Sequence, residues 1–375
     1  MKIVIAPDSF KGSLTAMEAA DAIEIGFQAV YPDAEYVKVP MADGGEGTVQ
    51  SLVDATSGTI INQSVIGPKG DMVPGFFGIL GGSRTTVVEM SAASGIHLVK
   101  LEERNIYLAS SFGTGQLINA ALDHGCDKLI IGLGGSATND GGMGMMKALG
   151  AQFLGQGGTP LAPDVRALLQ LAKIDLQYLD PRLSKTEIVA ACDVNNPLCG
   201  KNGASRIFGP QKGATEDDIV VLDKALARYG DVLAINTGRN IAAKPGAGAA
   251  GGMGAALIGL IDAVVKPGVD LVIEIVDLAK SLVDTNLVIT GEGRIDSQTI
   301  HGKTPIGVAK IAKSYDIPVI CIAGSIGSGV DLVSEVGFDR IYGVTEGDTI
   351  PTIKLIEAGH NLTRAAQKIA KSLNL

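Results

Sequence analysis

The sequence contains no tryptophan, and aromatic residues occupy only 4% of its 375 positions. Proteins that bind single-stranded nucleic acid need aromatic side chains on which bases stack, so this class of function is disfavoured. Basic residues are also outnumbered, because 31 lysines and arginines stand against 40 aspartates and glutamates, for a net charge of −9. General nucleic-acid binding requires a basic face, and the charge therefore argues against a nucleic-acid partner.

Cysteine and histidine are equally scarce, with four residues of each type. The cysteines form no C-x-x-C pair and have no histidine at a zinc-like spacing, so we expect buried free thiols in a reducing cytosol. The first residues predict a strand and lack the apolar core of a signal peptide. The most membrane-like stretch, residues 245–261, is uncharged, but it consists mainly of glycine and alanine and is a poor membrane span. We expect a cytoplasmic protein without a membrane partner.

Glycine, in contrast, is abundant, with 50 of 375 residues, against a usual share of about 7%. No collagen-like repeat accompanies it, so the excess belongs to turns and loops. In such loops glycine lets backbone N–H groups approach a ligand closely. Apolar residues make up 46% of the chain, which is enough for a large core in two domains.

Both ends of the chain alternate short apolar strands with helical patterns. A capping box, Thr15 with Glu18, starts a helix that runs to about Val30, and a closing helix carries Ile353 and Ile356. This order predicts parallel strands with right-handed crossovers. The predicted strands are residues 2–6, 35–39, 287–290, 319–323 and 341–344.

The middle of the chain has a different pattern. Residues 59–65, 73–80 and 85–89 resemble antiparallel strands joined by tight turns. We therefore predict an α/β protein in which a parallel α/β domain is built from residues 1–60 plus 285–375. A second, mixed α/β domain, residues 61–284, is inserted into it.

Three glycine-rich loops with charged residues follow strands of the predicted parallel sheet. Ligands bind beyond the carboxyl ends of such strands, so the three loops are expected to meet in one crevice. Any one of them alone is also compatible with a simple tight turn. The residues concerned are Asp8, Ser9 and Lys11, then Asp43, Gly44 and Gly45, then Gly291, Glu292, Gly293, Arg294 and Asp296.

A fourth glycine-rich loop, residues 132–142, lies in the predicted inserted domain between a strand and a helix. Its N–H groups, hydroxyls and helix N-terminus suit an oxyanion, although a structural turn explains the pattern equally well. Gly132, Gly134 and Ala137 also fit G-x-G-x-x-A, but the acidic residue of a dinucleotide site is missing. Gly302-Lys303-Thr304 resembles the end of a Walker A loop, but the motif is incomplete because Ser297 stands where it needs its first glycine.

Asp193, Asn195 and Asn196 follow a strand predicted at residues 187–191. They either cap the next turn or bind Mg²⁺ through oxygen ligands. The inventory of phosphate-cradling loops, aspartates and a few cations, without a nucleophilic dyad, is that of phosphoryl transfer. The residues alone indicate a Mg-nucleotide and a small anion, and they do not name the acceptor.

At these same residues the chain resembles the bacterial glycerate kinase family of glycerate and glucarate catabolism. The resemblance implies transfer of a phosphoryl group from ATP to D-glycerate, with 2-phosphoglycerate the usual product. It also implies a flavodoxin-like domain with an inserted domain likened to restriction endonucleases. The matching stretches are residues 6–16, 42–48, 132–150, 192–214, 245–254 and 290–309.

Within this reading we assign roles on physical grounds. Asp296 is expected to act as the general base or as a Mg²⁺ ligand, and Asp193 is the alternative residue for both roles. Arg294 is expected to bind the substrate carboxylate, and Lys11 is expected to lie nearer the phosphates. Transfer is expected in a cleft between the two domains. The remaining alternatives are a kinase of another small hydroxy acid and a non-catalytic nucleotide sensor, and a homo-oligomer is possible. Asp8, Ser9, Asp43, Gly44 and Gly45 complete the expected substrate site, and the expected nucleotide contacts are Gly134, Gly135, Ser136, Ala137, Thr138, Gly291, Glu292 and Gly293.

Overall fold

The computed structural model describes residues 1–297, 299, 303–330, 337–345 and 357–373. The predicted helical positions Ile353 and Ile356 lie outside these ranges, as do Gln298 and His301. The chain divides into two compact units. Unit 1 contains residues 1–43, 50–58 and 267–375, and unit 2 contains residues 44–49 and 59–266.

The boundary between the units differs from the predicted one at residue 284. Helices α9 (Gly268–Ile275) and α10 (Leu278–Ser281) belong to unit 1 rather than to the inserted segment. The reason is the packing of α9 on α11 (Thr304–Lys313), where a Cβ atom at Gly307 would stand 2.1 Å from Cγ1 of Val269. This close contact ties α9 to the C-terminal part of the chain.

Unit 1 is built on a parallel sheet. Neighbouring strands follow the order β2-β1-β11-β13-β14, and the short β12 pairs with the end of β13. Counted along the chain, with the two-residue β12 left out, this order is 2-1-3-4-5. The five strands predicted at the two chain ends are therefore confirmed as β1 (Lys2–Ile5), β2 (Glu35–Lys38), β11 (Leu287–Thr290), β13 (Val319–Ile326) and β14 (Arg340–Thr345), whereas β12 (Arg294–Ile295) was not predicted.

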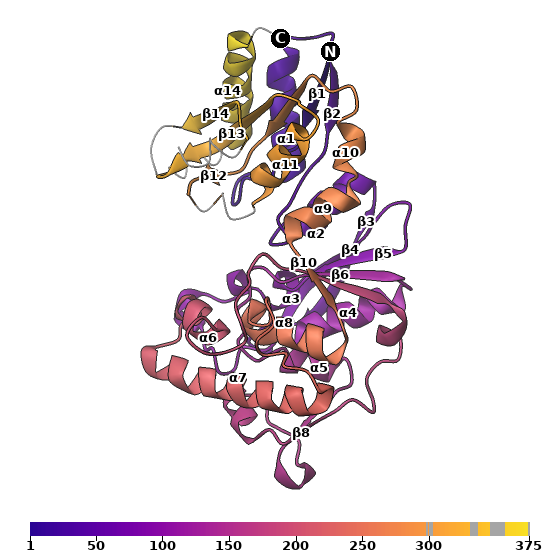
Figure 1. Ribbon diagram of the computed structural model, residues 1–375, viewed down its shortest axis with the longest axis vertical. Helices are drawn as coiled ribbons and strands as arrows, with labels where there is room; N and C mark the ends of the chain where they lie inside the picture. Colours follow the sequence, from indigo (N-terminus) through magenta and orange to yellow (C-terminus); the bar gives the residue numbers. More distant parts are fainter. Residues whose placement is uncertain (298, 300–302, 331–336, 346–356, 374–375) are drawn as a thin grey trace. The chain divides into compact units, whose positions relative to one another are not determined.

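Helices cover both faces of this sheet (Figure 1). Side chains alternate along a strand, so Ile3 and Ile5 of β1 point to one face, where α1 (Ala16–Gln28) and α14 (Ala358–Ser372) bury them. Helix α11 packs on β11 and β13 from the other side. The predicted capping box of α1 is present, since the hydroxyl of Thr15 accepts a hydrogen bond from the N–H of Glu18.

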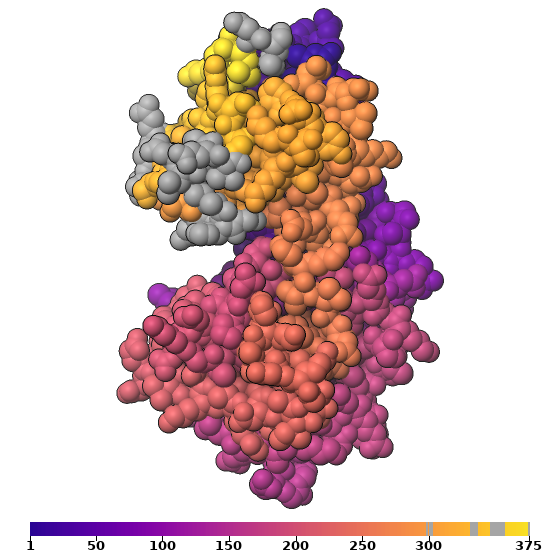
Figure 2. Space-filling model, viewed as in Figure 1, coloured from indigo at the N-terminus to yellow at the C-terminus, as the bar shows by residue number. Residues whose placement is uncertain are grey.

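The docking of α1 on α14 requires a glycine. A Cβ atom at Gly26 would lie 2.6 Å from both the Cβ of Ala366 and the carbonyl oxygen of Thr363. This contact joins the two ends of the sequence, and the N-terminal residues and α14 lie at the same end of unit 1 (Figures 1 and 2).

Unit 2 contains a mixed sheet in the order β10-β9-β6-β5-β4-β3. The predicted antiparallel strands are confirmed, because β3 pairs with β4 and β4 with β5 in antiparallel fashion, whereas β5, β6, β9 and β10 are parallel. The bounds are β3 (Thr59–Ile66), β4 (Met72–Ile79), β5 (Thr85–Glu89), β6 (Lys128–Gly132), β9 (Glu187–Ala191) and β10 (Val264–Lys266), and β7 (Gln152–Leu154) pairs separately with β8 (Lys173–Asp175).

Helices surround this sheet and share one apolar core with it. The longest, α7, begins at a second capping box made by Thr215 and Asp218. Among the residues that the structure describes, no helix has the length and apolar character needed to cross a membrane. The protein is thus α/β, with parallel strands in both units. Helix α7 spans Glu216–Thr237, and the bounds of the other helices are α2 (Thr48–Thr56), α3 (Ser91–Ser94), α4 (Phe112–Asp123), α5 (Met143–Ala148), α6 (Ala204–Phe208) and α8 (Ala249–Leu260).

Candidate active site

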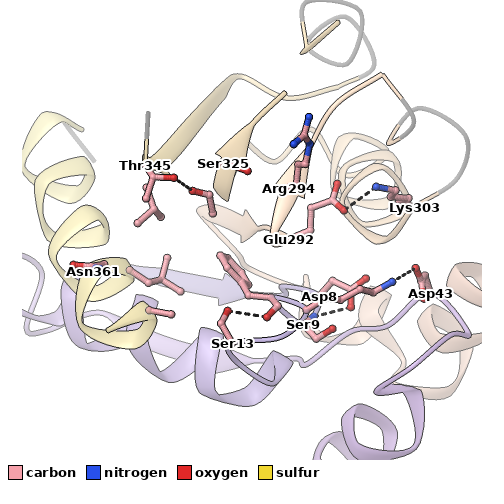
Figure 3. Close-up of a pocket in the computed structure, with 17 residues that line it drawn as sticks. Asp8, Ser9, Ser13, Asp43, Glu292, Arg294, Lys303, Ser325, Thr345 and Asn361 are labelled. Carbon is pink, nitrogen blue, oxygen red and sulfur yellow. Dashed lines mark hydrogen bonds and ion pairs between the residues drawn. The ribbon is translucent and has the colours of Figure 1, made fainter. Parts of the chain in front are cut away.

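The strand order of unit 1 defines where a ligand is expected. Strand β2 lies on one side of β1, and the later strands follow on the other side, so the order reverses between β1 and β11. Outside the carboxyl ends of parallel strands, such a reversal is the usual ligand site. A cavity of about 290 Å³ lies there, lined by the loops after β1 and β11, the ends of β13 and β14, and α14 (Figure 3).

Asp8 is one of the buried carboxylates of this cavity, with only 5% of its surface exposed. Its Oδ1 accepts a hydrogen bond of 2.6 Å from the N–H of Ser9, and Oδ2 accepts one of 2.7 Å from the hydroxyl of Thr304. Its own N–H donates to the carbonyl of Gly291, so the loops after β1 and β11 are fastened together. Burial, followed by the negative charge of Asp43, raises the pKa of Asp8 from 3.8 to about 7.

Lys11 and Asp43 form an ion pair on the same wall, with 3.6 Å between Nζ and Oδ2 (Figure 3). Burial alone would lower the pKa of Lys11, but the carboxylates of Asp43 and Asp8 outweigh it and raise this pKa above its ordinary value. Lys11 therefore carries a positive charge at neutral pH. The cavity thus places one ammonium group between two carboxylates from different loops.

The opposite wall comes from the loop after β11. Glu292 is buried and accepts hydrogen bonds from the hydroxyl of Thr299 at 2.7 Å and from Nζ of Lys303 at 3.3 Å. Burial raises the pKa of Glu292, although the Lys303 charge opposes it. Glycine is required at residue 291, because a Cβ atom there would stand 2.1 Å from the carbonyl oxygen of Ile322. Gly293 lines the cavity beside Glu292.

Arg294 lines the cavity, and its side chain is 45% exposed. Its Nε donates to Oδ2 of Asp296 at 3.2 Å. Asp296 itself is not among the residues that line the cavity. Asp8 therefore lines the cavity itself, whereas Asp296 contacts a residue of the lining, Arg294.

Sequence reasoning did not propose several residues of this cavity. Ser325 is the last residue but one of β13 and Thr345 is the last residue of β14, and the hydroxyl of Thr345 donates to the carbonyl of Gly324 at 2.8 Å. The rule that ligands bind at the carboxyl ends of parallel strands could have found both. The only sequence signal at Lys303 is the incomplete Walker A motif, of which it is a part. Asn361 comes from α14, and no sequence signal marks it.

The glycines predicted next to Asp43 belong to unit 2. A Cβ atom at Gly132 would stand 2.6 Å from the carbonyl oxygen of Gly44, and one at Gly134 would stand 2.7 Å from Cα of Gly45. Two of the glycine-rich loops thus pack backbone to backbone. Glu89 holds the first of them, because its carboxylate accepts from the N–H of Val49 at 2.6 Å. Burial raises the pKa of this carboxyl to about 7.

The second of these loops contains Gly134, Gly135, Ser136, Ala137 and Thr138. Its hydroxyl and carbonyl groups bind a lysine, since Nζ of Lys212 donates to Oγ of Ser136 at 2.6 Å and to the carbonyl of Thr138 at 2.7 Å. The helix N-terminus expected to bind an oxyanion is already capped. Asp140 accepts there from the N–H groups of Gly142 and Gly144, which favours the structural turn, the alternative left open for this part of the loop.

Asp193 also lies in unit 2, after β9, and it is exposed. The neighbouring Asn196 donates to the carbonyl of Asn202 at 2.8 Å, and its own carbonyl accepts from the N–H of Gly248. Asn196 therefore stabilises turns. Asp193 and Asp296, the two predicted Mg²⁺ ligands, belong to different units.

Known proteins resemble the chain over its whole length. A solved structure from Salmonella typhimurium LT2, described as glycerate kinase 2, superimposes with a TM-score of 0.90 and 49% identity, covering 99% of this chain and 98% of the other. Glycerate kinase of Bacillus subtilis is 54% identical over 376 residues, with 100% of this chain and 98% of that protein covered. Glycerate 2-kinase of Escherichia coli K12 is 50% identical over 373 residues, with the same coverage.

Fold and site together define an α/β protein whose acidic and basic side chains meet at the switch point of a parallel sheet, the arrangement of an enzyme that handles small anions. The family model for the glycerate kinase family matches residues 3–374. The chain belongs to the glycerate kinase family, as the sequence motifs predict.

Proposed function

We propose that this protein transfers the γ-phosphoryl group of ATP to D-glycerate and that the product is 2-phosphoglycerate. The observation that carries the proposal is the convergence of Asp8, Lys11 and Arg294 on one cavity at the switch point of unit 1. Membership of the glycerate kinase family supports the choice of substrate, and the 50% identity to a glycerate 2-kinase supports the 2-hydroxyl as acceptor.

Arg294 is the proposed anchor for the carboxylate of glycerate. A guanidinium binds a carboxylate through two parallel hydrogen bonds, which fixes its orientation as well as its position. Asp296 accepts from Nε of Arg294 and so holds the guanidinium plane. We assign Asp296 a positioning role on this ground, in place of the base role expected from the sequence.

Asp8 is the proposed general base. It lines the cavity, and the pKa of about 7 that burial gives it is near neutral pH, where a general base works best. Thr304 and Ser9 hold the carboxylate in one orientation. In this role Asp8 accepts the hydroxyl proton of glycerate as the oxygen bonds to phosphorus and the bond to ADP breaks.

Lys11, whose ammonium group interacts with the carboxylates of Asp43 and Asp8, is the proposed partner of the phosphate oxygens. Mg²⁺ usually binds through one or two carboxylates plus substrate phosphates. The cavity fits this pattern, because the carboxylates of Asp8 and Asp43 both line it. Asp43 is the residue that would hold the ion, with Asp296 and Asp193 kept as predicted alternatives, and a bound ion would neutralise phosphate charge.

Other parts of the prediction belong to the same proposal. Gly291, Glu292 and Gly293, together with residues 134–138, are proposed to contact the nucleotide, and transfer is proposed to occur in a cleft between the domains. The strand order 2-1-3-4-5 supports the flavodoxin-like description of unit 1. The likeness of unit 2 to restriction endonucleases stays a prediction.

A coupled assay for ADP release tests the proposed substrate. Purified protein is given ATP, Mg²⁺ and, in turn, D-glycerate, L-glycerate, lactate and glycolate. We expect turnover with D-glycerate to exceed the others by at least about tenfold in kcat/KM. Equal or faster turnover with another hydroxy acid would reassign the substrate, and ATP binding without turnover on any acid would indicate a nucleotide sensor.

A further inference from the structure

Unit 2 contains a cavity of its own, separate from the site in unit 1. Its volume is about 210 Å³. Apolar side chains form part of the wall, among them Ile96, Val99 and Leu108. The remaining wall is charged, and its cations, Lys69, Arg104 and Lys212, outnumber its single carboxylate, Glu103. A cavity of this composition favours a small anion that also carries some apolar surface.

Lys212 is the unusual member of this wall. Only 2% of its surface is exposed, and its two hydrogen-bond acceptors, Oγ of Ser136 and the carbonyl oxygen of Thr138, are both uncharged. Burial lowers the pKa of Lys212 to about 7, and Asp140 only partly opposes this effect. An ammonium can donate three hydrogen bonds, and burying one without a counter-charge is costly. Among the described residues no carboxylate pairs with it, so a bound anion would supply the missing charge.

Arg104 is held beside Lys212. Its Nη1 donates to the carbonyl of Gln211 at 2.8 Å, and Gln211 directly precedes Lys212. Its Nε donates to the carbonyl of Val99 at 3.4 Å. These contacts fix the guanidinium to both sides of the cavity. Lys69, in contrast, already forms an ion pair with Glu103 and contributes less charge to a ligand.

We propose that this cavity is a phosphoryl-binding site in which Lys212 and Arg104 hold the phosphate oxygens. Phosphate accepts several charge-assisted hydrogen bonds at once, and arginine and lysine are its usual partners. The volume is below the about 300 Å³ of sites that enclose drug-sized ligands, so a phosphoryl group on a short carbon chain fits more readily than a whole nucleotide. The source is either a phosphorylated small acid or the phosphate end of a nucleotide that extends outside.

This inference rests on the proposed function in one respect, since Ser136 and Thr138 belong to the loop proposed to contact the nucleotide. Its test is binding rather than turnover. The full chain is titrated calorimetrically with inorganic phosphate, 2-phosphoglycerate and ADP without Mg²⁺. All proteins carry Lys11→Met, which removes the proposed phosphate partner in the unit 1 cavity. Two variants, Arg104→Gln and Lys212→Met, are compared with Lys201→Met, which changes an exposed lysine of the same unit.

We expect at least one probe to bind to the Lys11→Met protein. Arg104→Gln and Lys212→Met should each weaken this binding at least about tenfold, and Lys201→Met should leave it within about twofold. Tighter binding of 2-phosphoglycerate than of ADP identifies a small phosphorylated acid, and the reverse order identifies a nucleotide. No binding, or equal affinity in Arg104→Gln, overturns the proposal. Arg104→Gln decides the matter if Lys212→Met fails to fold.

Discussion

Replacing Asp8 by asparagine removes the charge of the proposed base and keeps the size of the side chain. A general base contributes about 10²–10⁴ to the rate, so kcat should fall by at least about a hundredfold. Asparagine can keep both contacts of the Asp8 side chain, because its oxygen can accept from the N–H of Ser9 and its amide group can donate to the hydroxyl oxygen of Thr304, which now lies 2.7 Å from Oδ2 of Asp8. The loop should therefore keep its shape, and the KM values for ATP and glycerate should change little.

The same variant should alter how stability depends on pH. The folded-state pKa of Asp8, about 7, exceeds its ordinary value of 3.8, so between these values the folded protein binds more protons than the unfolded chain. The free energy of unfolding of the wild type therefore falls as pH rises through this window. The full pKa difference corresponds to about 4 kcal/mol at about 1.4 kcal/mol per tenfold change in proton affinity. This figure is an upper bound.

Asp8→Asn removes that loss and should become more stable than wild type as pH rises from 4 to 8. With an unfolding entropy of about 0.8 kcal/mol/K for a chain of this length, 4 kcal/mol corresponds to about 5 °C in melting temperature. Scanning calorimetry at pH 4 and pH 8 in EDTA measures the difference, and Asp33→Asn, an exposed aspartate of the same unit, is the control. A melting difference that does not change with pH, together with kcat within a few fold of wild type, would refute the role of Asp8.

Three further substitutions test other parts of the account. Arg294→Lys should raise the KM for glycerate by about ten- to hundredfold, since a bidentate charged hydrogen bond is lost, and should leave the KM for ATP unchanged; equal changes in both would reject the carboxylate role. Asp296→Asn should raise the KM for glycerate and lower kcat less than Asp8→Asn does, whereas a hundredfold loss of kcat at constant KM would return the base to Asp296. Gly26→Ala should lower the melting temperature by a few degrees, because overpacking costs about 1–3 kcal/mol, while Gly359→Ala, whose added Cβ would meet only Leu14 at 3.7 Å, should not.

The sequence predicts the sheet of unit 1 well because its strands carry a strong local signal. Strand β13, for example, begins with the continuous apolar run 319–323. The capping box of Thr15 and Glu18 is recognised from a segment of only four residues. The boundary near residue 284 is missed because it depends on the contact of Gly307 with Val269, residues 38 positions apart. Such a contact leaves no mark in either local pattern.

The candidate site is predictable in part, for the same reason. Loops after parallel strands are found by rule, and Asp8, Lys11, Asp43 and Arg294 do line one cavity. Which carboxylate faces the cavity is set by packing, and local sequence favours Asp296 no less than Asp8. Lys212 is hidden for another reason, since a lysine in a glycine-rich turn reads as exposed until the fold buries it.

The identity of the product tests the central claim most directly. Phosphorus NMR of a reaction of the wild-type protein with ATP, Mg²⁺ and D-glycerate shows which carbon bears the new phosphate. The account predicts a phosphomonoester signal split into a doublet by the single proton on carbon 2, growing in step with ADP. A triplet from the two protons on carbon 3 would contradict the 2-phosphate assignment, and the absence of any new phosphomonoester would contradict glycerate phosphorylation itself.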